Sequence, residues 1–364
     1  MDTTSNSGQN QIALRGLAPP SDGVEQADMS SSHPVCQRAY LLPSLPILQA
    51  CNEVLRCLAM RRPSCAVIGP SRFGVTYACE YIAAEAGNVV PGLLVVRLVS
   101  RRSDGAPRSE TFFRWMNEYS TGSPNFGPLR TGSSLEALTR QWQVKAASVG
   151  ATHIALFIDA VHRLNANELV YLSDLINRLF AKGLRVTPVC FGSPEIVHLR
   201  SALANSGQIE LIGQFFAHLI LFSGLTSKED LGNFMSGYDD PQVAEFPPGS
   251  GWSFSRFFFP TAYEHGWRLE SEAASLWMAF QKVALSVKVK KTSMDFGAEY
   301  FSAAIENALV DGMNFQISHK PFDPKAWSEA VEDCGYREAV GVTFSPGASL
   351  DDYLKPKLIS SRAQ

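Results

Sequence analysis

Residues Cys65 to Tyr81 read CAVIGPSRFGVTYACEY, and this stretch constrains the fold more than any other. Its first four residues form a short apolar run that is typical of a buried parallel strand. A turn from Gly69 to Gly74 follows, and a series of good helix formers begins at Thr76. In this order of strand, glycine-bounded loop and helix, backbone N–H groups hold a phosphate at a helix N-terminus. The sequence therefore predicts a phosphate-binding loop.

The predicted loop departs from its motif at one position. The spacing G-x-x-x-x-G-x-[ST] is complete from Gly69 to Thr76, but Val75 stands where the motif requires lysine. The glycines that shape the backbone of the loop are present. The lysine side chain, whose charge would contact the outer phosphates, is absent. Arg72 is the nearby cation, and a guanidinium at a different loop position is a weak substitute. The nucleotide-binding residues predicted in the loop are Gly69, Pro70, Ser71, Arg72, Phe73, Gly74, Val75 and Thr76.

The rest of the chain is organised as alternating strands and helices followed by helices. Strands are predicted at 65–68, 92–99, 153–158 and 184–191, and helices at 47–60, 134–149 and 166–181. Strands that alternate with helices favour a parallel sheet with helices on both faces. After residue 227 helices dominate, at 228–237, 270–286 and 298–311. The predicted fold class is α/β, a P-loop sheet flanked by helices and followed by a smaller helical lid domain.

Domain boundaries follow from changes in composition. Residues 1–34 are rich in Ser, Asn, Gln and Gly without an apolar period, and we expect a disordered tail there. The nucleotide-binding-type α/β domain is expected at 35–226 and the helical lid domain at 227–320. A C-terminal extension at 321–364 contains one short predicted helix, 325–334, and returns to a mixed composition of proline, glycine and charged residues.

Composition narrows the class of protein. The 364 residues are 45% hydrophobic with a formal net charge of -3, which is typical of a globular chain with one large core and a smaller domain. A net charge near zero does not indicate nucleic-acid binding, although it is compatible with a local basic face. The 7 cysteines contain no CxxC pair, so we expect reduced thiols and no zinc site. Since no apolar run is long enough to cross a bilayer, a cytoplasmic protein is expected.

Two further polar residues are expected beside the loop. Asp159 ends the apolar strand ALFID, where an aspartate could hold Mg²⁺ together with the hydroxyl of Thr76. Ligands bind at the carboxyl ends of parallel strands, where the loop and Asp159 would both lie. Ser193 follows the fourth strand, at the place of a residue that senses the γ-phosphate. In isolation a helix cap explains Asp159 as well, and a Ser-Pro turn explains Ser193 as well.

Four segments in this order resemble a known family. GPSRFGVT, ALFIDAVHRL, FGSPEI and LIGQFF are similar to the motifs of the TniB/TnsC-type AAA+ regulators of DNA transposition, and the resemblance covers roughly residues 40–310. The later segment FFFPTAYEHGWRLESEAASLWMAF resembles the helical lid of that family. The resemblance implies an ATP-dependent oligomer that coats DNA and links a target-selection protein to the transposase. Gly69, Gly74 and Thr76 match the phosphate loop, Asp159 the magnesium site, His162 and Arg163 the DEAH-R segment, and Ser193 the sensor turn.

The chain departs from the family at the positions that carry the chemistry. Val75 replaces the lysine, Ala160 the glutamate that orients water, and Gln214 the arginine of the GRF segment. Phosphoryl transfer depends on positioning and charge stabilisation, so each loss should lower the rate by orders of magnitude. We therefore expect a pseudo-ATPase without catalytic residues, which binds ATP or ADP with Mg²⁺ weakly at best.

Cations in two segments are the candidates for DNA contacts. Phosphate contacts need cations on one face and little sequence specificity, although solvated charged loops are an equally simple explanation. The candidates are Arg101, Arg102 and Arg108 after the second strand, and Lys288, Lys290 and Lys291 in the lid.

Three hypotheses remain open at this point. The first is a hydrolysis-deficient regulator that binds DNA, the transposase and a target-selection protein, as a homo-oligomer or in a mixed oligomer with an active paralogue. The second is a working ATPase in which Arg72 replaces the missing lysine. The third is a protein-interaction scaffold that binds neither nucleotide nor DNA.

Overall fold

The computed structural model describes residues 23–102, 105, 107–121, 134–287, 289, 294–313 and 321–343. The chain divides into two compact units. The sheet unit begins at Pro46 and ends at Ser223, and the helical unit combines the N-terminal residues up to Leu45 with the chain from Gly224. The helical unit therefore gathers segments from both ends of the chain, and the division differs from the expected domain boundaries at 35 and 321.

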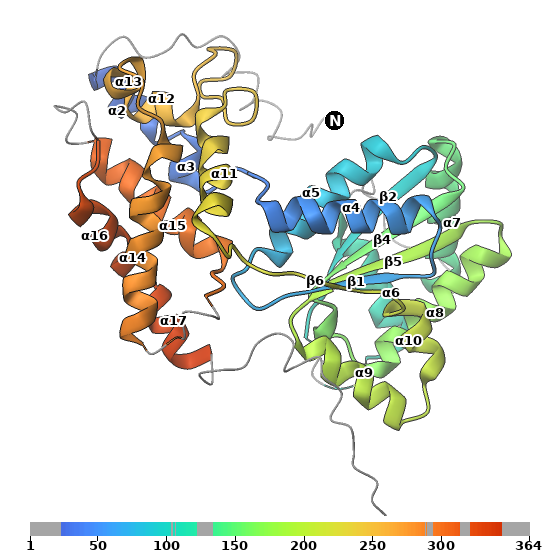
Figure 1. Ribbon diagram of the computed structural model, residues 1–364. Coiled ribbons are helices and arrows are strands. Elements are labelled where there is room, and N and C mark those ends of the chain that lie inside the picture. Colours follow the sequence, from blue (N-terminus) through green and yellow to red (C-terminus); the bar gives the residue numbers. More distant parts are fainter. Residues whose placement is uncertain are drawn as a thin grey trace, which may run out of the picture. The chain divides into compact units, whose positions relative to one another are not determined.

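The sheet unit is built on six strands in the order β3-β2-β4-β5-β1-β6 (Figure 1). They are β1 (Cys65–Ile68), β2 (Leu93–Val99), β3 (Ser120–Thr121), β4 (His153–Asp159), β5 (Arg185–Gly192) and β6 (Leu219–Leu221). Five strands are parallel, and β3 pairs antiparallel with β2 at the edge. Since β1 pairs with both β5 and β6, the residues that follow it start from the interior of the sheet.

Helices cover both faces of this sheet because side chains alternate along each strand. Cys65 and Val67 belong to the core beneath α4 (Leu45–Ala59) and α5 (Val75–Val89). Ala66 and Ile68 belong to the core on the other face. That face is covered by α6 (Ser109–Tyr119), α7 (Ser134–Ser148), α8 (Ala166–Ala181), α9 (Glu195–Asn205) and α10 (Ile209–Phe215). The predicted fold class, a parallel sheet flanked by helices, is confirmed.

The strand β6 was absent from the sequence prediction. It has only three residues, and a run of this length has no periodicity that distinguishes it from a helix or a turn. Pairing with β1 defines it, with Ala66 opposite Leu219 and Ile68 opposite Leu221. The Phe222 N–H then donates to the Ile68 carbonyl at 2.8 Å, which extends the pairing to the start of the loop.

The helical unit has a core made largely of aromatic side chains. Its helices are α11 (Lys228–Asp239), α12 (Phe254–Phe258), α13 (Pro260–Glu264), α14 (Ala273–Ser286), α15 (Ala298–Gly312), α16 (Pro324–Asp333) and α17 (Tyr336–Thr343), with the 3-10 turn η2 (Leu269–Glu272) before α14. Phe257 and Phe258 in α12 are fully buried. These two phenylalanines therefore serve packing.

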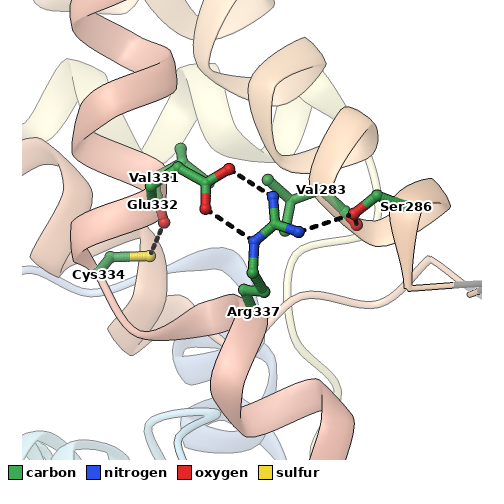
Figure 2. A network of polar contacts seen from close by, with 6 residues as sticks. All are labelled: Val283, Ser286, Val331, Glu332, Cys334 and Arg337. Atoms are coloured by element: carbon green, nitrogen blue, oxygen red, sulfur yellow. Dashed lines mark hydrogen bonds and ion pairs between the residues drawn. The ribbon is translucent and has the colours of Figure 1, made fainter.

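The C-terminal helices belong to this core as well. Trp327 of α16 is fully buried, and its indole N–H donates to Glu272 at 3.1 Å. Figure 2 shows Arg337 of α17 hydrogen-bonded to Glu332 at the end of α16 and, at 3.4 Å, to the hydroxyl of Ser286 at the end of α14. The part of the expected extension that the structure describes is thus packed against the helical unit. No helix among the described residues is long and apolar enough to cross a bilayer.

The N-terminal segment differs from the expected tail. Two short helices, α2 (Gly23–Ser30) and α3 (Pro34–Gln37), lie within the range expected to be disordered or just after it. Between them His33 is fully buried, with its ring 4.5–4.7 Å from those of Phe246, Phe254, Phe257 and Phe258. Its Nδ1 accepts a hydrogen bond from the Val35 N–H at 3.0 Å. Contacts distant in sequence order this segment, which a local pattern cannot reveal.

His33 makes the stability of the helical unit depend on pH. Burial lowers the pKa of His33 from 6.5 to about 3. The unfolded chain takes up this proton near pH 6.5 and the folded chain only near pH 3, so the free energy of unfolding falls as pH is lowered through this window. At about 1.4 kcal/mol per pH unit, the loss over this window amounts to as much as ~5 kcal/mol.

We expect His33→Asn, which keeps an acceptor for the Val35 N–H, to flatten this dependence. Urea unfolding of the full chain between pH 7 and pH 4 measures it. His265→Asn, at an exposed position in the same unit, is the matched control and should retain the slope of the unchanged protein. Equal slopes in the two variants would contradict the assignment.

Candidate phosphate-binding site

The loop predicted to bind phosphate connects the end of β1 to the start of α5. The Gly69 N–H donates to the carbonyl of Gly192 at 3.1 Å, which ties the loop to the end of β5. A Cβ on Gly69 would lie 2.8 Å from the backbone oxygen of Phe222 and 2.9 Å from Cγ2 of Val75. Glycine is therefore required where the chain leaves the sheet.

Two further residues set the conformation of the loop. Gly74 has φ of +99° and precedes the first residue of α5, a left-handed conformation that suits glycine. Phe73 is only 4% exposed and packs in the core beneath α4 and α5. Arg72, which directly precedes Phe73, is exposed and has φ of +64°. The loop thus leaves the end of β1 and ends at the N-terminus of α5.

The side chain at the lysine position is used for packing. Val75 lies at the first position of α5, and its Cγ2 atom would lie 2.9 Å from a Cβ built on Gly69. The same side chain packs against the apolar core that contains Phe73 and Phe222. An apolar contact therefore occupies the position from which a lysine would reach the outer phosphates.

Asp159 and Thr76, the two residues expected to hold Mg²⁺, interact with each other. Asp159 is 6% exposed, at the end of β4. Burial raises the pKa of Asp159 above its usual range, and hydrogen bonds from the Ala160 N–H and the Thr76 hydroxyl oppose this shift. The N–H of Ala160 donates to Oδ1 at 2.8 Å. A carboxylate and a hydroxyl are oxygen ligands of the kind Mg²⁺ prefers, with water and phosphate supplying the rest.

Two arginines beside Asp159 contribute charge to the site. Arg97 and Arg163 both lower the pKa of Asp159, against the effect of burial. Arg97 in β2 also forms an ion pair at 2.9 Å with Glu80 of α5. Arg97 was not among the predicted site residues, although a charge within the apolar run LLVVRLV is a signal that indicates it. Arg163 was predicted only as part of the DEAH-R segment.

Ser193 and His162 form a second contact behind the loop. The Ser193 N–H donates to Nδ1 of His162 at 3.2 Å. His162 belongs to the 3-10 turn η1 (Val161–Arg163), which follows Asp159. A Cβ on Gly192 would lie 2.6 Å from the same Nδ1, so glycine lets the imidazole approach. Burial lowers the pKa of His162, which favours the neutral ring that accepts this hydrogen bond. The loop, Asp159 and Ser193 are thus brought to neighbouring strand ends.

Ala160 and Gln214, the two other positions at which the chain departs from the motifs it resembles, carry no charge. Ala160 has a left-handed conformation with φ of +52° and directly precedes η1. Gln214 is half-buried in α10. Within the described residues, no group of three or more His, Cys, Asp or Glu side chains is placed to hold a metal ion. A cation at this site would therefore depend on Thr76, Asp159 and the phosphates of a bound ligand.

The candidate DNA-binding residues are only partly described. Arg101, Arg102 and Arg108 are exposed after β2, and the Arg101 guanidinium lies 5.0 Å from the centre of the Trp115 ring in α6. Stacking on tryptophan positions this cation at the surface. The three lysines Lys288, Lys290 and Lys291 lie outside the described residues.

No family model and no curated protein matches the chain. The chain is similar to several solved structures. Among them are Hsp104 with ATPγS and casein (20% identity, TM-score 0.43) and domain III of the replication initiation protein DnaA from Thermotoga maritima (15%, 0.41). AMPPCP-bound DnaA from Aquifex aeolicus is another (12%, 0.31). The alignments cover 86%, 78% and 84% of this chain and 44%, 89% and 80% of those chains. The chain thus spans less than half of the Hsp104 chain, and the conclusions below rest on the geometry of the site.

Gly69→Ala tests the geometry of the loop. The added methyl group meets the rigid backbone oxygen of Phe222, so we expect a loss of about 1–3 kcal/mol in the free energy of unfolding. Gly213→Ala is the matched control, because no atom lies within 4 Å of a Cβ there and α10 should gain stability by up to about 1 kcal/mol. Thermal and denaturant unfolding measure both. A neutral effect of Gly69→Ala would contradict the packing described above.

Proposed function

We propose that this protein is a hydrolysis-deficient AAA+ regulator of DNA transposition. It assembles on DNA and links a target-selection protein to the transposase. The observation that carries the hydrolysis deficiency is that Val75, packed against an apolar core, stands at the lysine position of a loop whose motif spacing is otherwise complete. The ordered resemblance of its four motifs to the TniB/TnsC-type regulators supports the role in transposition.

The groups that remain are those that bind, and the groups that are lost are those that accelerate hydrolysis. The backbone of Gly69 to Gly74 and the N-terminus of α5 favour a phosphate, and Thr76 with Asp159 would hold Mg²⁺ beside it. Bound Mg²⁺ would supply charge neutralisation of the phosphates. Without the lysine and the glutamate, the outer phosphate and the attacking water lack their positioning groups. ATP or ADP would bind weakly, and turnover would be very slow.

Asp159 is the reason to favour weak nucleotide binding over a scaffold without ligands. A buried carboxylate costs free energy, as the raised pKa of Asp159 shows. Arg97 and Arg163 reduce this cost, and a divalent cation would reduce it further. A subunit with these properties could join an oligomer with an active paralogue that supplies hydrolysis.

Restoring the lost groups tests the proposal. Val75→Lys should strengthen ATP binding in the presence of Mg²⁺ by about tenfold or more, because a charge reaches the outer phosphates. Adding Ala160→Glu should raise ATP turnover above that of the unchanged protein, since glutamate orients water and bears the same left-handed backbone cost as alanine. Isothermal titration calorimetry and phosphate release measure the two effects. Val75→Leu is the matched control that changes size without charge.

Two outcomes would contradict the proposal in different ways. Robust ATP turnover by the unchanged protein that disappears in Asp159→Ala would exclude hydrolysis deficiency, and its loss in Arg72→Ala would identify the working-ATPase alternative. Absence of ATP, ADP and DNA binding at low salt, in the unchanged protein and in Val75→Lys, would favour the scaffold.

DNA binding through Arg101, Arg102 and Arg108 predicts a defined salt dependence. Each cation that neutralises a phosphate contributes about 0.9 to the slope of log K against log salt concentration. Replacing the three arginines by alanine should therefore make the slope less steep by about 2–3. Fluorescence anisotropy with a labelled duplex measures it. Lys182→Ala is the control and should leave the slope unchanged, since this exposed cation lies in the turn before β5, at the opposite ends of the parallel strands from the three arginines.

A further inference from the structure

Exposed apolar side chains gather at the amino ends of the parallel strands, the end of the sheet opposite the phosphate loop. The connections that lead into β1, β2, β4 and β5 each carry one large apolar residue with more than half of its surface exposed. They are Met60 (60%), Val89 (55%), Val149 (53%) and Phe180 (67%). One exposed apolar residue is ordinary on a protein surface, but four at the same end of one sheet indicate a surface that another molecule covers.

The same end of the sheet carries cations. Two cations follow Met60 in the turn before β1, and two follow Phe180 in the turn before β5 and at its first residue; they are Arg61, Arg62, Lys182 and Arg185. The sequence has no aspartate or glutamate in any of the four connections, at 60–64, 89–92, 149–152 and 180–184. This end of the sheet is therefore locally positive, although the formal net charge of the chain is -3.

Hydrogen bonds hold the four connections side by side. The Thr152 N–H donates to the carbonyl of Gly92 at 3.3 Å, and the Thr152 carbonyl accepts a hydrogen bond from the Arg185 N–H at 3.2 Å. The guanidinium of Arg61 donates to the hydroxyl of Thr152 at 3.3 Å. The turns before β1, β2, β4 and β5 thus form one continuous surface, and the cation of Arg61 is oriented within it.

Met60 and Phe180 border the cations from the two faces of the sheet. Met60 directly follows α4, which belongs to the core on one face, and Phe180 is in the last turn of α8, which belongs to the core on the other face (Figure 1). Since β1 and β5 are neighbouring strands, the ends of these two helices flank the same pair of turns. A segment lying across the turns would meet cations at its centre and an apolar side chain on each side.

We propose that this amino-end surface binds an acidic protein segment that also carries large apolar side chains. The amino-end surface is formed by Met60, Arg61, Arg62, Phe180, Lys182 and Arg185. Methionine, phenylalanine and arginine are residue types enriched at protein interfaces. A carboxylate can accept two hydrogen bonds from one guanidinium, and the contact with Thr152 already orients that of Arg61.

The combination of charge and apolar surface favours a protein over the two other common anionic partners. Nucleic acid is attracted by cations, but exposed apolar side chains gain nothing from contact with phosphate groups. Anionic membranes are bound by helices whose apolar residues lie along one face, whereas the apolar residues here lie at or beside the ends of separate helices. The amino-end surface uses none of the residues assigned to nucleotide or DNA, so its role is independent of the proposed function.

Differential selection of peptides tests the amino-end surface. The probe is a phage-displayed library of random peptides of about twelve residues, selected on the immobilised full-length protein and counter-selected on the triple variant Arg61→Gln, Lys182→Gln, Arg185→Gln. We expect the recovered peptides to be rich in aspartate and glutamate and to contain large apolar residues. A recovered peptide with a fluorescent label should bind the triple variant about tenfold or more weakly than the unchanged protein, as measured by fluorescence anisotropy.

Phe180→Ser separates the apolar contribution from that of charge. It removes an exposed apolar side chain and leaves the charge unchanged, so we expect the same peptide to bind about fivefold or more weakly. Arg140→Gln is the matched control, an exposed cation within α7, and should bind the peptide as tightly as the unchanged protein. Circular dichroism and thermal unfolding establish that the variants are compared as folded proteins.

Three outcomes would overturn the proposal. The first is that no recovered peptide distinguishes the unchanged protein from the triple variant. The second is that the peptides which do distinguish them lack acidic residues or lack large apolar residues. The third is a loss of binding to duplex DNA, or to vesicles of phosphatidylcholine and phosphatidylserine, in the triple variant, because this would assign the surface to nucleic acid or to lipid.

Discussion

The pairing of β1 with strands on both sides is the constraint on which the candidate site depends. Hydrogen bonds to β5 and β6 hold the four residues of β1, and the two contacts just beyond it continue the same pairing. The Phe222 N–H donates to Ile68, and the Gly69 N–H donates to Gly192. The start of the candidate phosphate loop is therefore attached to both neighbouring strand ends by backbone hydrogen bonds. These bonds do not depend on the side chains of the loop. This explains why the loop keeps its geometry although its lysine position is occupied by valine.

The sequence predicted the sheet more fully than the surroundings of the site. Continuous apolar runs, as in β1 and β4, arise because strands buried on both faces need no polar residue, so the class of sheet could be predicted. The contact of Thr76 with Asp159 also followed, since loop and strand end meet at the carboxyl edge. The roles of Arg97, His162 and Phe222 could not be predicted in the same way. They depend on which strands become neighbours, and three-residue β6 gave no periodic signal.

The order of the N-terminal segment, with α2 and α3, could not be predicted from its local composition either. A stretch that is poor in apolar residues is typical of disorder, because it cannot bury enough surface by itself. Here the segment need not do so, because four phenylalanines distant in sequence provide the apolar surface against which His33 packs. They are Phe246, Phe254, Phe257 and Phe258. Gln26 adds hydrogen bonds from its side-chain amide to the carbonyls of Phe257 and Phe258. The information that orders the segment lies more than two hundred residues away in the chain.

Val75 in the loop and Asp159 at the end of β4 have opposite effects on the stability of the folded protein. Valine at position 75 adds an apolar contact to a core, so it stabilises the fold around the loop. Asp159 has the opposite effect, because burial disfavours its charge and raises its pKa. A chain selected only for stability would gain by replacing a buried carboxylate with an uncharged residue of similar size. The protein instead surrounds Asp159 with the Ala160 N–H, the Thr76 hydroxyl and two arginines. This combination favours a site that still binds a charged ligand, over a fold in which the loop has only a structural role.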